Sequence, residues 1–162
     1  MLSESGIVRS DITSSFGDAS GAAVYLWHCD RDGNYSMYSA DVADENYLRG
    51  VQVAGADGRL AFTSIFPACY AGRWPHMHFE VYPSVDDART YANKLRTSQL
   101  ALPEDVCNDV YGSAEGYEQS VSNLAQTSLD SDGIFSDGYS LQMATVAGSV
   151  DEGYTVSLSV PV

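Results

Sequence analysis

Two histidines separated by one residue are the most informative chemical feature of the sequence. His76 and His78 lie in the segment Arg73-Trp-Pro-His-Met-His-Phe79, and His28 is the third and last histidine. Residues i and i+2 of a β-strand point to the same face, so the two imidazoles are expected side by side, as metal ligands would be. This spacing alone is explained more simply by two strand histidines that bind no metal. Further donor residues are needed to favour a metal site over that interpretation.

Further segments upstream and downstream of the histidines supply such donors. Upstream, the chain reads Trp27-His28-Cys29-Asp30-Arg31-Asp32-Gly33-Asn34-Tyr35-Ser36, then Arg49-Gly50, then Asp57-Gly58-Arg59-Leu60-Ala61-Phe62-Thr63-Ser64-Ile65-Phe66-Pro67-Ala68-Cys69-Tyr70. Downstream, it reads Thr97-Ser98-Gln99-Leu100. Taken in this order around the histidine pair, these motifs resemble those of the intradiol ring-cleavage dioxygenases. The resemblance extends over residues 22–100.

The resemblance implies a mononuclear, non-haem Fe(III) site. Position by position, the family's four iron ligands fall on Tyr35, Tyr70, His76 and His78. Two phenolates are hard anionic donors that favour ferric iron, and two imidazoles complete the donor set. An ordinary interior role remains open for either tyrosine alone, because the chain has 11 tyrosines.

The resemblance also implies the reaction and its other residues. It predicts cleavage of catechols by O2 to cis,cis-muconate-type products, in degradation of lignin-derived aromatics. Tyr70 would also accept a catechol proton, Arg73 would stabilise charge on the substrate ring, and Gln99 would border the substrate and oxygen pocket. Tyr38 and Trp74 are candidate walls of the substrate pocket. His28 belongs to the motif but matches no ligand position, so it is expected to be structural.

Two alternatives belong to other functional classes. One is a non-catalytic β-sandwich binding module that retains the motif. The other is a zinc hydrolase, which the sequence supports poorly, because no acidic residue accompanies the histidine pair at motif spacing and tyrosine is an uncommon zinc ligand.

Composition and charge limit the classes of partner. The chain has 162 residues, and 8 Lys+Arg against 22 Asp+Glu give a net charge of −14, which would repel nucleic acids and anionic membrane surfaces. No apolar run is long enough for a membrane span. A single lysine, Lys94, and abundant Ser, Thr, Ala, Tyr and Gly are typical of a secreted bacterial protein. Residues 1–5 do not read as a signal peptide, so secretion is inferred from composition and from the resemblance, which indicates the small secreted branch of the family. A homodimer is compatible with the sequence.

The elements that must hold these residues are mostly strands. Alternating or apolar runs ended by turn residues predict strands at 22–27, 47–53, 60–65 and 77–82, and a closing hairpin from 142–148 and 154–160. Residues 85–100 fit either a hairpin or a short helix, and a helix is expected to start at Pro103, with a second short helix or turn near 117–125. These elements predict an all-β sandwich with short helical insertions.

One domain is expected, preceded by a short arm. Residues 1–20 are polar and rich in Gly and Ser, which predicts a loosely held N-terminal arm, and residues 21–162 would form the catalytic domain. Of the three cysteines, Cys69 and Cys107 are the pair we guess to form a disulfide, which would leave Cys29 free.

Overall fold

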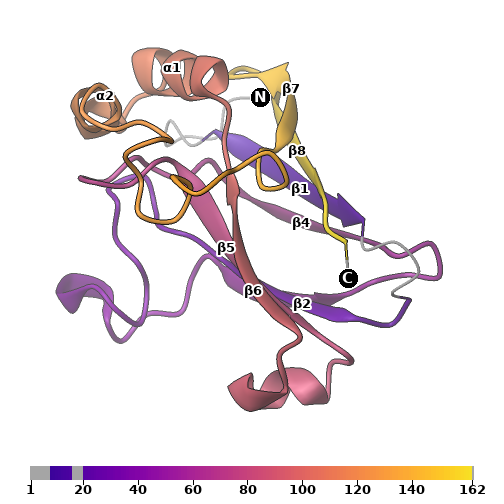
Figure 1. Cartoon of the computed structure of the whole chain (residues 1–162). Coiled ribbons are helices and arrows are strands. Elements are labelled where there is room, and N and C mark those ends of the chain that lie inside the picture. Colours follow the sequence, from indigo (N-terminus) through magenta and orange to yellow (C-terminus); the bar gives the residue numbers. More distant parts are fainter. Residues whose placement is uncertain (1–7, 16–19, 162) are drawn as a thin grey trace.

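Two four-stranded sheets form the protein (Figure 1), as expected for an all-β sandwich with short helical insertions. The computed structural model describes residues 8–15 and 20–161. One sheet has the order β4-β1-β8-β7 and the other the order β3-β2-β5-β6. The strands are β1 Arg9–Ser15, β2 Ala23–Trp27, β3 Arg49–Val53, β4 Arg59–Ile65, β5 His76–Tyr82, β6 Arg96–Ala101, β7 Thr145–Ser149 and β8 Gly153–Ser159.

Short helices are inserted between the strands. Residues 85–95 contain two single 3-10 turns, Asp87–Arg89 and Tyr91–Asn93, and β6 follows, so both structures considered for this region are partly present. After Pro103 come α1 Glu104–Ser113 and α2 Glu118–Leu124, at the top of Figure 1. A further 3-10 turn lies at Ala40–Val42. Among the described residues, no helix is both long and apolar enough to cross a bilayer.

The core lies between the two sheets and is built from alternate strand residues. On β5, Met77, Phe79 and Val81 are buried and point inward, where Leu26 of β2 is the cross-strand partner of Phe79. Ile12 of β1 is fully buried in the same core cluster. Because side chains alternate along a strand, packing the inward set fixes His76 and His78 on the opposite, outward face.

The outward face of the β3-β2-β5-β6 sheet carries a row of polar and aromatic residues across four strands. Cross-strand pairing places Arg49 opposite Trp27, Trp27 opposite His78, and His78 opposite Gln99. This row brings together residues that are up to 72 positions apart in the sequence. The sheet register therefore positions most of the candidate site.

The expectation of a loosely held N-terminal arm is wrong for residues 9–15. They form β1, which pairs antiparallel with β4 and parallel with β8 inside its sheet. Burial of Val8 and Ile12 and the ladders on both sides hold this segment in place. Residues 1–7 and 16–19 of the proposed arm lie outside the described residues.

The guess of a Cys69–Cys107 disulfide is also wrong. All three cysteines are buried free thiols. The Cys69 thiol donates to the Arg73 carbonyl, with a sulfur–oxygen distance of 3.5 Å, and the Cys29 thiol donates to the Ala68 carbonyl at 3.6 Å. Cys107 packs in the hydrophobic core from α1.

Candidate metal centre and active site

The histidine pair stands at the start of β5, on the outward face. The two Nε2 atoms of His76 and His78 are 3.1 Å apart. The indole of Trp27 stacks on the His78 imidazole, with ring centroids 4.8 Å apart and an interplanar angle of 7°. The spacing of one residue thus presents two imidazole nitrogens to the same point, as the strand periodicity predicts.

Two tyrosines reach the same point from loops that follow β2 and β4. Tyr35 Oη lies 3.2 Å from His76 Nε2 and 3.0 Å from His78 Nε2. Tyr70 Oη lies 3.4 Å from Tyr35 Oη and 3.3 Å from His76 Nε2. The two loops touch at Gly33, which has a φ of +86° and would place a Cβ 3.1 Å from Tyr70 Cβ. Glycine there allows the turn and the close approach that bring both phenols inward.

Two phenol oxygens and two imidazole nitrogens therefore converge, with each atom 3.0–3.4 Å from at least two of the others. Donors bound to one metal ion at roughly 2.0–2.1 Å lie about 3 Å from each other, so the cluster has the dimensions of a coordination site. Among the described residues, no group of three or more His, Cys, Asp or Glu side chains has metal-binding geometry, so this site depends on its two phenols. Two phenols and two imidazoles suit ferric iron better than they suit zinc.

Burial shapes the protonation of these four side chains. It lowers the pKa of His76 to about 4 and that of His78 to about 3, so both imidazoles are neutral and able to bind a metal at neutral pH. It raises the pKa of Tyr35 well above its usual value and also raises that of Tyr70. A phenol in such a position loses its proton only when strong positive charge lies beside it, as a bound ferric ion would provide.

A second hydrogen bond orients the His76 ring. His76 Nδ1 donates to the Trp74 carbonyl over 2.5 Å, so Nε2 is left without a proton and faces Tyr35 and Tyr70. The ring of Phe135 lies against the same imidazole, 6.4 Å between centroids. Support of this kind fixes both the tautomer and the direction of a metal-binding histidine.

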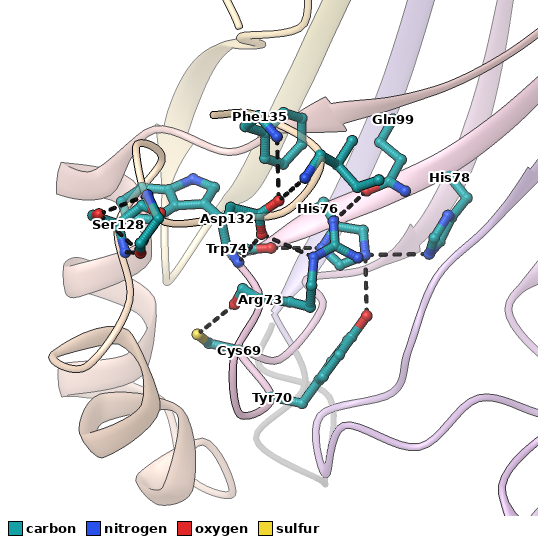
Figure 2. A network of polar contacts seen from close by, with 12 residues as sticks. Cys69, Tyr70, Arg73, Trp74, His76, His78, Gln99, Ser128, Asp132 and Phe135 are labelled. Carbon is teal, nitrogen blue, oxygen red and sulfur yellow. Dashed lines mark hydrogen bonds and ion pairs between the residues drawn. The ribbon is translucent and has the colours of Figure 1, made fainter. Parts of the chain in front are cut away.

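Arg73 lies beside the four donors and is held on two sides (Figure 2). Its Nη2 donates to Gln99 Oε1 over 2.6 Å, and its Nε donates to Asp132 Oδ2 over 2.8 Å. Its positive charge opposes the burial that raises the pKa of Tyr70, and it adds to the burial that lowers the pKa of His76 and His78. The structure thus brings Arg73 and Gln99 together at the candidate site.

Asp132 is the residue of this site that the sequence analysis missed. Its side chain is fully buried and accepts hydrogen bonds from Arg73 Nε and from the backbone N–H groups of Trp74, Ile134 and Phe135. Burial alone would raise the pKa of Asp132, but these hydrogen bonds and the Arg73 charge hold it below its usual value. Nothing in the local sequence Ser131-Asp132-Gly133 separates this residue from an ordinary turn aspartate.

The two candidate pocket walls occupy different environments. Tyr38 is 70% exposed, close to Tyr35 along the chain, and the guanidinium of Arg49 lies 4.6 Å from its ring centroid. Trp74 is 4% exposed and its Nε1 donates to the Leu102 carbonyl, so its indole is part of the core. We therefore keep Tyr38 as a candidate substrate contact and leave Trp74 out.

His28 lies apart from the four donors, with both ring nitrogens engaged. Nδ1 donates to the Cys29 carbonyl, and Ser64 Oγ donates to Nε2, each over 2.7 Å. The ring is 2% exposed. This environment fits the structural role expected for His28.

The fold and the site together define a class of protein: a two-sheet sandwich with a cluster of tyrosines and histidines on the outer face of one sheet. Known proteins of similar sequence and structure agree with this class. A family model described as "Dioxygenase" matches residues 7–78. Chlorocatechol 1,2-dioxygenase of Rhodococcus opacus is 40% identical over 67 residues, which are 38% of this chain and 26% of that protein. The chain thus spans about a quarter of this curated relative.

Solved structures show the same fold over nearly the whole chain. An intradiol ring-cleavage dioxygenase from Tetranychus urticae matches with a TM-score of 0.81 and 22% identity, over 99% of this chain and 83% of that chain. Catechol 1,2-dioxygenase of Acinetobacter radioresistens matches with a TM-score of 0.62 and 17% identity, over 96% and 52%. The resemblance to the intradiol ring-cleavage dioxygenases is confirmed by these findings.

Proposed function

We propose that the protein cleaves catechols with O2 between the two hydroxylated ring carbons, at a ferric ion held by Tyr35, Tyr70, His76 and His78. The observation that carries this proposal is the convergence of two phenol oxygens and two imidazole nitrogens, each 3.0–3.4 Å from at least two of the others. When bound there, ferric iron would supply the positive charge that draws both catechol oxygens into the site and activates the ring towards O2. The relatives' names support the substrate class, which we extend to lignin-derived catechols and cis,cis-muconate-type products.

The protein's own residues would perform the proton and charge chemistry. Tyr70, whose Oη contacts Tyr35 Oη and His76 Nε2, is the group we assign to accept a proton from the catechol. Arg73 would place its cation beside the substrate oxygen on which charge develops. Gln99 holds one side of that guanidinium through Nη2.

Oxygen consumption by the iron-loaded protein tests this function. With catechol, we expect one O2 consumed for each muconate formed, with product followed by its ultraviolet absorbance. Tyr35→Phe and His78→Ala should fail to retain iron, whereas Tyr91→Phe, a change at an exposed tyrosine, should behave as wild type. An iron-replete wild-type protein that binds catechol but consumes no O2 would contradict the proposal and support a binding module.

Arg73→Ala separates catalysis from iron binding. Because Arg73 is not among the four donors, this variant should keep its iron. Loss of a positioned charge at the reacting centre should lower kcat by a factor on the order of 100. Unchanged kcat would remove the proposed role of Arg73.

A further inference from the structure

Arg73 has a fixed orientation, and the contacts that fix it come from distant parts of the chain. Gln99 of β6 accepts from Nη2, and Asp132, 59 residues further along the chain than Arg73, accepts from Nε. No partner for Nη1 is present within residues 8–15 and 20–161. The Arg73 side chain is 21% exposed, and the N–H groups that these two contacts do not use are the ones we assign to the substrate.

Asp132 is more deeply buried and has more hydrogen bonds than an aspartate in an ordinary surface ion pair. Its side-chain exposure is 0%, against 21% for Arg73. Oδ2 accepts from Arg73 Nε and from the Trp74 backbone N–H, both over 2.8 Å, and Oδ1 accepts from the Ile134 and Phe135 backbone N–H groups over 2.8 and 3.3 Å. Four donors satisfy the two carboxylate oxygens, which compensates for burying the charge.

The same carboxylate contacts the backbone that carries the first histidine. The Trp74 peptide donates its N–H to Asp132, and the Trp74 carbonyl accepts from His76 Nδ1. Figure 2 shows the Asp132 carboxylate next to Arg73 and Trp74, with Phe135 on the same segment as Asp132. Asp132 therefore connects the segment after α2 to the loop that places both Arg73 and His76.

We propose that Asp132 is a positioning residue that aims the free edge of Arg73 at the substrate site. This inference rests on the proposed function for its catalytic part, but the geometric part concerns the protein alone. Asn in place of Asp keeps the size and removes the charge. It also turns an NH2 group towards one of the two donor pairs, so the hold on Arg73 should weaken.

The geometric part is tested by NMR on the full chain without metal. The Arg73 Nε–H, which donates to a buried carboxylate, should exchange slowly with water. Asp132→Asn should speed this exchange by at least about tenfold, as expected when a charge-assisted hydrogen bond is lost. Asp109→Asn is the matched control, because Asp109 of α1 accepts from Tyr154 Oη of β8, away from the site, and should leave the exchange unchanged. Unchanged exchange in folded Asp132→Asn would overturn the proposal.

The catalytic part is tested by a double-mutant cycle on kcat per bound iron. Asp132→Asn should lower kcat by a factor on the order of 10–100 in the wild-type background. In the Arg73→Ala background the same change should have almost no further effect, because Asp132 acts through Arg73. An equal factor in both backgrounds would mean a purely structural role and would overturn the proposal.

A second variant and the turnover of wild type keep the result decisive. Asp132→Ser, which also removes the carboxylate, is measured in parallel so that poor folding of one variant does not decide the outcome. If iron-loaded wild type shows no turnover while Arg73 exchange depends on Asp132, the proposed function fails and the positioning role stands. If wild type turns over, and neither the exchange rate of Arg73 nor kcat changes when Asp132 is replaced, the positioning role fails and the proposed function stands.

Discussion

His28 is a buried neutral histidine, and its burial makes the stability of the protein depend on pH. Burial lowers the pKa of His28 to about 4, against 6.5 for the free side chain. Between these values the unfolded chain binds the proton and the folded chain does not. The free energy of unfolding should therefore fall as the pH is lowered from about 6.5 to about 4, by up to about 3 kcal/mol from this residue.

Urea unfolding of the metal-free protein at several pH values checks this prediction, with His28→Gln as the reference that cannot titrate. The free energy of unfolding of wild type should exceed that of the variant by a constant amount above about pH 6.5. This difference should shrink as the pH is lowered towards 4. Because His76 and His78 also have lowered pKa values, only the difference between the two proteins isolates His28. A difference in the free energy of unfolding that does not change with pH would contradict a buried, neutral His28.

Ser10 is a buried hydroxyl without a hydrogen-bond partner among the described residues. Its side chain lies on the core side of β1 and is 0% exposed. Replacing it with Ala removes an unsatisfied polar group, so Ser10→Ala should raise the free energy of unfolding by about 1 kcal/mol. Ser157→Ala, which removes the 2.9 Å hydrogen bond to Thr13 on the outer face, should not stabilise the protein. Destabilisation by Ser10→Ala would show that its hydroxyl does have a partner.

At the scale of elements, β1 is the strand whose contribution differs most from expectation. Ile12 is its buried anchor, between Phe62 of β4 and Val156 of β8 in the sheet register. Ile12→Ala should therefore cost about 2–4 kcal/mol in denaturant unfolding, as a core truncation does. Thr13→Ala on the opposite face should cost less than about 1 kcal/mol. If Ile12→Ala and Thr13→Ala both left the free energy of unfolding nearly unchanged, the segment would be a loosely held arm after all.

Most other elements follow from local patterns in the sequence. The alternation in β4 and β5, each bounded by proline or glycine turns, predicted both strands and placed the two histidines on one face. The closing hairpin of β7 and β8 was predicted in the same way. β1 was missed because Ile12 is its one large apolar residue, so its strand structure depends on partners that are distant in sequence.

At the scale of the whole molecule, the sequence motifs predicted which residues lie near each other but not what holds them. Tyr35, Tyr70, His76 and His78 were named from a motif, and the structure brings them together. Asp132 was missed because its link to Arg73 spans 59 residues and exists only after the chain has folded. The cysteine pairing failed for a related reason, since thiol environments are set by tertiary packing. Secretion and a homodimer remain predictions.

The central claim of the proposed function is a ferric site with two phenolate and two imidazole ligands that binds catechol. The most direct test is the visible spectrum of the purified, iron-quantified protein, before and after anaerobic addition of catechol. We predict about one iron per chain, a tyrosinate-to-iron charge-transfer band, and a shift of that band when catechol binds. A colourless protein that takes up no ferric iron would contradict the assignment of Tyr35, Tyr70, His76 and His78.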